Sequence, residues 1–262
     1  MLLLDGVQET MLIPLAIKAN ETQRQNARIQ DFKAVEIVKK LDVDLSKYDK
    51  FISHEGVVAR TILFDKAMKH YVEEYPKAVC ISIGCGFDAR FSRVDNGEII
   101  WYDLDLPDVI AARKQFFAEQ ERVNLIAKSA LDSTWPKEVE KRETTIILIE
   151  GMLMYLKEEE VKKLLGIIKD NFHDVIILAE LMPTQSSKIS KYHDTVKNTN
   201  ATFKWGVKSG KDVEKLCQGL KLIDEKGFNC EMKKYSVRGK LFASIPFIRD
   251  FNDRIAIFSL SS

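Results

Sequence analysis

The sequence has no excess of charge of either sign. Lysines and arginines number 40 and aspartates and glutamates 39 among 262 residues, so the formal net charge is +1. Domains that bind nucleic acid or anionic membranes usually carry a basic patch. The doubled lysines at 39–40, 162–163 and 233–234 are balanced by acids and are interpreted as solvated faces. We therefore expect no nucleic-acid partner.

Cysteines and long apolar runs are also scarce. The four cysteines, Cys80, Cys85, Cys217 and Cys230, have neither metal-ligand nor redox spacing. A reduced, cytoplasmic interior suits them better than a disulfide framework. The leucines near the start are interrupted by Asp5 and lack a basic segment before them, so no signal peptide is expected. Because the cysteines lack metal-ligand spacing, we expect no metal site. No run approaches the roughly 18 apolar residues of a membrane span, so we expect no membrane partner either.

Strand and helix patterns alternate through the middle of the chain. Short apolar runs predict strands at 78–84, 99–105, 123–128, 144–150 and 174–181. The stretches between them predict helices at 108–120, 134–141 and 157–171. Such alternation indicates βαβ units in a mainly parallel sheet. Farther on, a helix near 211–221 precedes two strands, 230–237 and 254–260, which we expect to pair antiparallel because no helix separates them.

This arrangement is typical of one fold class. A mainly parallel seven-stranded sheet with an antiparallel C-terminal hairpin indicates the Rossmann-like α/β fold of class I S-adenosylmethionine-dependent methyltransferases more than that of dinucleotide oxidoreductases. We interpret residues 1–262 as a single domain. Its segments are an N-terminal helical cap (1–75), a cofactor-binding core (76–182), a lid insertion (183–210) and a C-terminal helix and hairpin (211–262).

A glycine turn follows the first predicted strand. Gly84 and Gly86 lie in the sequence G-C-G-F-D-A at 84–89, which fits the pattern G-x-G-x-x-G/A. Glycine lets the backbone turn sharply and approach a ligand without a Cβ atom in the way. The pattern alone separates neither a dinucleotide from S-adenosylmethionine nor a ligand site from a tight turn.

Carboxylates end two of the predicted strands. Asp103 and Asp105 close the second strand, where a carboxylate commonly binds a nucleotide ribose, and alternation puts both on one face. Glu150 ends the most apolar run and would be costly to bury without a cation or donors. A cofactor ammonium or sulfonium would suit it, and a loop carboxylate that caps the next helix is the alternative. Arg60 can pair with a cofactor carboxylate, the alternative being a surface ion pair.

Several motifs together resemble those of a known family. In order, they are T-M-L-I-P-L at 10–15, G-V-V-A-R-T at 56–61 with Asp65, G-x-G-F-D-x-R at 84–90 with Arg93, W-Y-x-x-D-x-P at 101–107 and E-G-x-x-M-Y-L at 150–156. On these motifs the chain resembles the leucine carboxyl methyltransferase superfamily, and within it the bacterial polyketide-type (tetracenomycin-type) O-methyltransferases. Beyond about residue 180 the likeness is only architectural. Cys85 replaces another small residue of the family and is interpreted as a packing residue.

The resemblance implies S-adenosylmethionine as the cofactor and O-methylation as the reaction. It places the methionine carboxylate on Arg60, with Lys18 as a helper, and it favours Asp105 over Asp103 for the ribose. The remaining contacts that it implies are Gly84 in its turn with Gly86 for the methionine part, Ser129, Ala130 and Asp132 for the adenine, and Glu150 for the amino group near the sulfonium.

The methyl acceptor is expected to be a small, polyketide-like molecule that offers a carboxylate or a hydroxyl. A carboxylate is already nucleophilic, whereas a phenol or alcohol calls for a base. His193 in the predicted lid is the candidate base, with a surface histidine as the alternative. Tyr155 and Met154 are expected to line the acceptor pocket, with a core position as the alternative for Met154. Glu150, Tyr155 and His193 are the candidate catalytic residues. Oligomeric state stays open.

Two other functions share part of the pattern. A nicotinamide-dependent oxidoreductase has the same glycine turn and acid, but it predicts further parallel strands after residue 182 instead of a hairpin. A non-catalytic binding protein of the same fold predicts a lost cofactor motif, whereas Arg60, Asp105 and Glu150 are all present.

Overall fold

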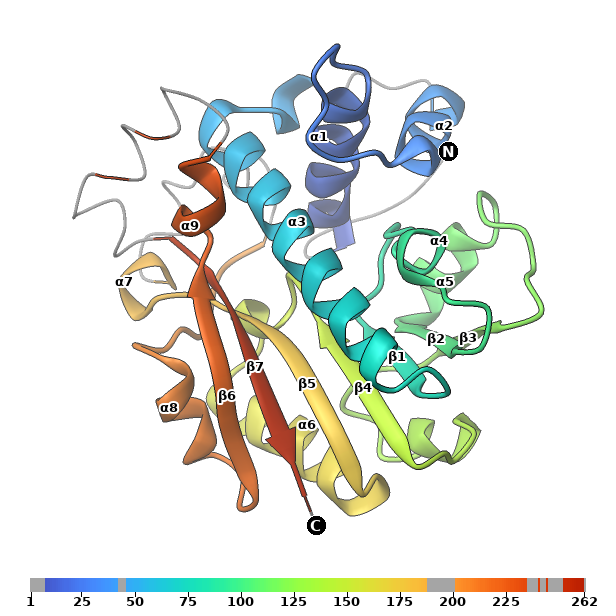
Figure 1. The fold of residues 1–262 in the computed structure, drawn as a ribbon, viewed down its shortest axis with the longest axis vertical. Coiled ribbons are helices and arrows are strands. Elements are labelled where there is room, and N and C mark those ends of the chain that lie inside the picture. Colours follow the sequence, from blue (N-terminus) through green and yellow to red (C-terminus); the bar gives the residue numbers. More distant parts are fainter. Residues whose placement is uncertain are drawn as a thin grey trace.

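A central sheet organises the protein (Figure 1). The computed structural model describes residues 8–41, 46–187, 201–234, 240, 244 and 252–261. Seven strands form the sheet in the order β3-β2-β1-β4-β5-β7-β6. Their bounds are β1 (Val79–Ile83), β2 (Ile100–Asp105), β3 (Val123–Ala127), β4 (Thr144–Ile149), β5 (Asp174–Leu181), β6 (Leu220–Gly227) and β7 (Arg254–Leu260).

The sheet is mixed in the way that the sequence predicts. Strands β1 to β5 pair in parallel, with β1 between β2 and β4. Strand β7 runs antiparallel to both of its neighbours, β5 and β6. The predicted mainly parallel seven-stranded sheet with an antiparallel C-terminal pair is therefore confirmed.

Helices cover both faces of the sheet and its upper end. Among the described residues, the α-helices include α1 (Leu12–Thr22), α2 (Phe32–Leu41), α3 (Phe51–Glu74), α4 (Phe91–Val94), α5 (Pro107–Arg113), α6 (Glu158–Asn171), α7 (Thr184–Ser187), α8 (Gly210–Glu214) and α9 (Asn229–Met232). The 3₁₀ turns are η1 (Gln8–Met11), η2 (Ser46–Tyr48), η3 (Trp135–Glu138) and η4 (Leu153–Tyr155). In the part of the chain that the structure describes, no helix combines the length and apolarity needed to cross a membrane.

The fully apolar central strands explain how the faces are covered. In β4, Ile146 packs in one cluster with Phe64 of α3, and its neighbour Ile147 packs in another with Leu164 of α6. Alternate side chains of a strand point to opposite faces, so an apolar run such as β4 needs a helix on each side. Helices α3 and α6 fill these two places (Figure 1).

Several predicted boundaries are wrong. Strand β6 lies at 220–227 and not at 230–237; the latter range begins in helix α9, and its residues from 235 on lie outside the described part. The predicted helix at 211–221 is only the short α8. Strand β6 is an edge strand rich in charge, and a bulge between Leu222 and Asp224 interrupts its alternation. Edge strands use such charges and bulges, which hide the period-two signal in the sequence.

Predicted helices elsewhere also change length. Helix α5 ends at Arg113 instead of near 120, and the predicted helix at 134–141 is the 3₁₀ turn η3. Within the predicted N-terminal helical cap, helix α3 begins at Phe51, so Arg60 lies well inside it. A proline early in α5 and in η3 suits a first helical turn and says nothing of where the helix ends.

Buried charges join the N-terminal helices to α3. Arg28 donates to Glu21 of α1 and to Glu55 of α3, both at 2.8 Å. The ring nitrogens of His54 lie 2.6 Å from Asp49 and 2.8 Å from Glu21. Since Glu21, His54 and Glu55 are all buried, these contacts hold α1 against α3 over the upper end of the sheet.

We expect the stability that His54 contributes to fall as the pH rises. Burial lowers the pKa of His54, but its hydrogen bonds to Asp49 and Glu21 outweigh burial and raise it above 6.5. The contribution is complete below the unfolded value of 6.5 and is lost as the pH passes through the raised folded value. Urea denaturation should show His54→Ala costing about 3 kcal/mol near pH 6, and less at each higher pH. A cost that stays constant with pH would contradict this.

Candidate functional site

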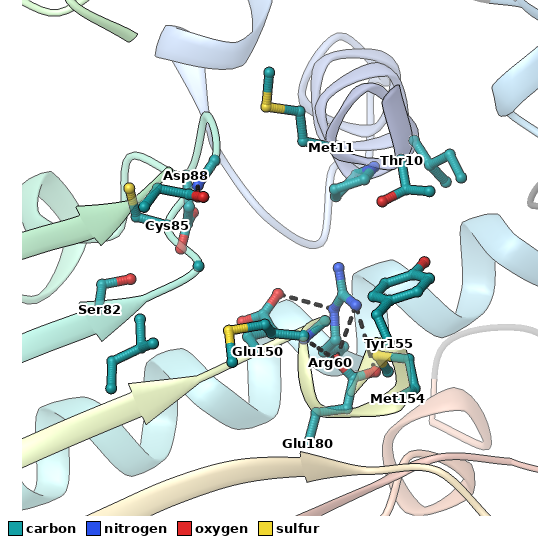
Figure 2. A pocket seen from close by; sticks show the side chains of 18 of the residues that line it. Thr10, Met11, Arg60, Ser82, Cys85, Asp88, Glu150, Met154, Tyr155 and Glu180 are labelled. Carbon is teal, nitrogen blue, oxygen red and sulfur yellow. Dashed lines mark hydrogen bonds and ion pairs between the residues drawn. The ribbon is translucent and has the colours of Figure 1, made fainter. Parts of the chain in front are cut away.

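A large cavity opens at the carboxyl ends of the parallel strands, beneath the N-terminal helices (Figure 2). Its volume is about 960 Å³. Residues at or just after the ends of four strands line it, namely Gly84, Asp105, Glu150 and Glu180. This edge is where ligands bind in open α/β sheets. The cavity therefore lies where the sequence predicts a site.

The glycine turn after β1 forms one wall of the cavity. Gly84 and Gly86 have φ angles of 72° and 47°, a region that residues with a side chain rarely adopt. A Cβ atom on Gly84 would lie 3.1 Å from the sulfur of Met152, and one on Gly86 would lie 3.2 Å from Met11. The turn is thus left-handed and tightly enclosed, so that its backbone borders the cavity.

The two aspartates of β2 have different surroundings. Asp103 is buried, accepts a hydrogen bond from the Trp101 indole at 2.8 Å and binds Arg113 at 2.6 Å. Asp105 lines the cavity and accepts from the backbone N–H of Gly86 at 2.8 Å. Burial raises the pKa of each carboxyl. Because Asp103 already has an internal cation and does not line the cavity, Asp105 is the aspartate available to a ligand.

Arg60 lies between two carboxylates on the cavity floor. Its Nε forms an ion pair with Glu150 at 2.8 Å, and its Nη1 donates to Glu180 at 3.0 Å. Figure 2 shows the remaining nitrogen, Nη2, directed into the open space below Met11 and Thr10. Arg60 therefore presents one edge of its guanidinium group to a ligand while the other edges are held.

Glu150 is paired rather than isolated. Its second oxygen forms an ion pair with Arg90 at 2.7 Å, in addition to the contact with Arg60. Burial raises the pKa of Glu150, but the charges of Arg90 and Arg60 outweigh burial and lower it. Glu150 is thus an ionised carboxylate on the cavity wall, and the helix-capping alternative does not describe it.

Lys18 reaches the same wall from α1. Its ammonium lies 2.6 Å from Asp88 in the glycine turn and 4.0 Å from Asp31. Asp88 also binds Arg90 at 2.8 Å and Arg93 at 3.2 Å. Lys18 lines the cavity and is nearly fully buried, so its main visible contact is with the turn itself.

The predicted adenine contacts are only partly at the cavity. Ser129 and Ala130, in the loop after β3, line it together with Lys128 and Leu131. Asp132 is not among the lining residues; its carboxylate accepts from the backbone and the hydroxyl of Thr134 instead. The carboxylate of Asp132 is therefore used within the loop after β3, in an Asx-type contact two residues along the chain.

The opposite wall is apolar and aromatic. Tyr155 and Phe203 pack with ring centroids 5.6 Å apart, and Met154 and Met182 line the cavity beside them. The backbone N–H of Lys204 donates to the carbonyl of Met154 at 2.7 Å, which ties the end of the predicted lid segment to η4. Burial raises the pKa of Tyr155 to about 12, so its phenol is neutral at physiological pH.

Two further predicted roles concern a histidine and a cysteine. His193 lies outside the described residues. Cys85 is buried in the glycine turn, and burial raises the pKa of its thiol well above the usual value. A thiol that stays protonated is a poor nucleophile, which agrees with a packing role for Cys85.

Three charged residues at this site are not among the site residues predicted from the sequence. Arg90, buried and paired with Glu150, is predicted only as part of a motif, and Glu180 and Asp253 are not predicted at all. Glu180 is the last residue but one of the apolar strand β5, much as Glu150 directly follows β4, so a similar signal marks it. No comparable signal marks Asp253, because its place depends on how β7 pairs with β5.

Comparison with known proteins agrees with this geometry. The leucine carboxyl methyltransferase family matches residues 12–169. The tetracenomycin polyketide synthesis O-methyltransferase TcmP of Streptomyces glaucescens is 25% identical over 85% of this chain and 83% of its own length. The S-adenosyl-L-methionine-dependent methyltransferase dpfgK of Gibberella zeae is 25% identical over 83% of this chain and 81% of its own.

Solved structures show the same fold. Magnesium protoporphyrin IX methyltransferase from Synechocystis, with S-adenosylhomocysteine bound, superposes with a TM-score of 0.52 at 13% identity and covers 88% of this chain and 100% of that one. The antiparallel β7 also differs from the further parallel strands that a nicotinamide-dependent oxidoreductase predicts. The family match spans more than half of the chain, and the fold and cavity agree with it, so this protein belongs to the leucine carboxyl methyltransferase family and is an S-adenosylmethionine-dependent methyltransferase.

Proposed function

We propose that this enzyme transfers the methyl group of S-adenosylmethionine to an oxygen of a small, largely apolar acceptor. The observation that carries the proposal is the convergence of Arg60, Asp105 and Glu150, from three distant segments, on one cavity. An arginine edge and two carboxylates suit a ligand that has a carboxylate, a ribose diol and cationic groups.

The cofactor roles follow from the charge that each side chain presents at the cavity. The Nη2 edge of Arg60 would bind the methionine carboxylate, with Lys18 adding positive charge nearby. Asp105 would accept from the ribose hydroxyls, and Glu150 would face the amino group beside the sulfonium. The backbone of Gly84 and Gly86 would border the methionine part. Each of these charged contacts is worth about 1.5–3 kcal/mol.

The adenine is proposed to lie at the loop after β3. Ser129 and Ala130 line the cavity there, and their surroundings include Leu106 and Leu131. An apolar slot of this kind suits a flat base. Asp132 keeps only an indirect part, because it holds Thr134 and thereby the shape of this loop.

The acceptor is proposed to occupy the aromatic wall. Tyr155, Phe203 and Met154 offer a flat apolar surface, as a polyketide-like ring system requires. The polyketide O-methyltransferase among the relatives supports this class of acceptor. Specificity for the acceptor would then depend on η4 and on the segment from 201 onward.

The chemistry is an in-line displacement. A lone pair of the acceptor oxygen attacks the methyl carbon, and the bond from that carbon to sulfur breaks with its electrons left on sulfur. Positioning of the two reactants supplies most of the rate acceleration, because it can lower the activation barrier by up to about 7–11 kcal/mol. Tyr155, being neutral, can donate a hydrogen bond to the acceptor but cannot serve as its base. Where the acceptor is a hydroxyl, its proton would go to His193 of the lid.

A cytoplasmic location belongs to the same proposal. All four cysteines are free, three of them buried, as in a reducing compartment. A small-molecule acceptor, without nucleic acid or membrane as partner, is the class of substrate that the enclosed cavity supports.

Calorimetry on the full chain tests the cofactor half of the proposal. S-adenosylmethionine and S-adenosylhomocysteine should both bind more tightly than millimolar to folded protein, and NADH should not. Incubation of phenolic and carboxylic polyketides with radiolabelled cofactor then tests the acceptor half. Mild alkali releases methanol from a methyl ester but not from an aryl ether, which separates the two acceptor types. Absence of cofactor binding by folded protein would refute the proposal.

A further inference from the structure

Glu180 contacts both elements that carry the cofactor-facing charges. One of its oxygens lies 3.0 Å from Nη1 of Arg60, and the same oxygen accepts from the backbone N–H of Gly151 at 2.6 Å. Arg60 comes from α3, whereas Gly151 directly follows Glu150 at the end of β4. One carboxylate at the end of β5 therefore links the arginine to the turn that holds Glu150.

Glu180 borders the cavity, but its side chain is more deeply buried than those of Arg60 and Glu150. Its side chain is 2% exposed, against 12% for Arg60 and 11% for Glu150. Figure 2 shows Glu180 below Arg60, on the side away from the open cavity. Glu180 would therefore act on a bound cofactor through its contacts with Arg60 and with the Gly151 turn.

The contacts of Arg60 define the direction of its free edge. A guanidinium group is planar, and its five N–H donors keep a rigid geometry. Glu150 holds Nε at 2.8 Å and Glu180 holds Nη1 at 3.0 Å. With two nitrogens of a rigid plane fixed, the direction of Nη2 is fixed as well. Without Glu180, only the Nε contact would remain.

We propose that Glu180 is a positioning residue that aims the free edge of Arg60 at the methionine carboxylate of the cofactor. This inference rests on the proposed function, in which Arg60 binds that carboxylate. The neighbouring Asp253, the residue before β7, completes the arrangement by a hydrogen bond to Glu180.

The protonation states of Glu180 and Asp253 agree with this role. Burial and the charge of Glu180 raise the pKa of Asp253 well above its ordinary value, so Asp253 is the protonated partner and donates to Glu180. Burial raises the pKa of Glu180 as well, but the charge of Arg60 and the hydrogen bonds from Gly151 and Asp253 oppose this rise, so Glu180 is the acid of the pair that carries the charge beside Arg60. A protonated Asp253 also avoids a second anion beside the cofactor carboxylate.

A pair of ligands isolates the positioning effect. S-adenosylhomocysteine has the methionine-derived carboxylate, and 5′-methylthioadenosine has the same nucleoside without it. In the full chain, Glu180→Ala should raise the dissociation constant of S-adenosylhomocysteine by about tenfold or more. The dissociation constant of 5′-methylthioadenosine should change by less than about twofold. Glu180→Gln keeps an acceptor oxygen and should give a smaller loss with the same selectivity.

Glu225 offers a matched control. It is also a strand glutamate that binds an arginine, Arg254 at 2.9 Å, and a backbone N–H, that of Gly210 at 2.9 Å. It does not line the cavity. Glu225→Ala should therefore leave the dissociation constants of both ligands unchanged, even if it lowers stability.

The possible results separate this inference from the proposed function. Wild-type protein that binds neither ligand refutes the proposed function. If wild type binds both, an equal loss for the two ligands, no loss, or tighter binding of S-adenosylhomocysteine overturns the positioning role. Tighter binding is what simple removal of an anion near Arg60 would give.

If Glu180→Ala does not fold, Glu180→Gln decides by the same comparison of the two dissociation constants. Arg60→Lys combined with Glu180→Gln should lose no more affinity than Arg60→Lys alone.

Discussion

Arg60→Ala should abolish calorimetrically detectable binding of S-adenosylhomocysteine and lower the free energy of unfolding by about 3–5 kcal/mol. The substitution removes a side chain that contacts both Glu150 and Glu180. Both carboxylates are about nine-tenths buried or more, so the loss leaves uncompensated charge in a poorly solvated place. The stability loss should shrink in acid, where these carboxyl groups can take up protons.

The control for Arg60 is an arginine with a similar but exposed pair. Arg122 lies 2.5 Å from Asp95, and its side chain is 30% exposed. Exposed ion pairs contribute about 0–1 kcal/mol, so Arg122→Ala should cost little and leave ligand binding unchanged. Arg60→Lys is the second comparison, because lysine keeps the charge without the planar geometry. If Arg60→Ala changed stability and ligand affinity as little as Arg122→Ala, Arg60 would not be a cofactor-binding residue.

The strand ends show how far sequence reasoning reaches. Asp105 and Glu150 stand out because the first ends and the second follows a buried strand, and the structure places both at the cavity. The same rule applies to Glu180, but the rule says nothing of which carboxylate faces the ligand and which lies beneath an arginine. That difference depends on where α3 crosses the sheet, which no local pattern records.

The errors have a common physical origin. Strand β6 is defined by its partner β7 and by the bulge between Leu222 and Asp224, not by an apolar pattern of its own. Likewise, the short contact of Lys18 with Asp88 requires α1 to lie over the glycine turn. Local propensity predicts elements that bury a continuous face. It does not predict edges and charged contacts whose partners are distant in the chain.

The two aspartates of β2 give the second large effect, because their substitutions should have opposite consequences. Loss of Asp105 should lower the affinity for the cofactor, and loss of Asp103 should lower the stability of the protein. Asp105→Ala should weaken S-adenosylhomocysteine binding by about 2 kcal/mol, roughly 30-fold, with little loss of stability, because Asp105 borders the cavity. Asp103→Ala should leave Arg113 buried without its carboxylate, which lies 2.6 Å away in the native protein. It should lower the free energy of unfolding by about 3–5 kcal/mol while the folded fraction keeps its affinity.

The pH dependence of binding gives an independent check on Asp105. Burial raises the pKa of this carboxyl, so it loses its charge at a higher pH than an exposed aspartate does. A neutral carboxyl is a weaker acceptor for ribose hydroxyls. The affinity of the wild type for S-adenosylhomocysteine should therefore fall as the pH drops through this raised value, and Asp105→Asn should remove that part of the fall. Were Asp103→Asn to remove it instead, the ribose would have to be assigned to the buried aspartate.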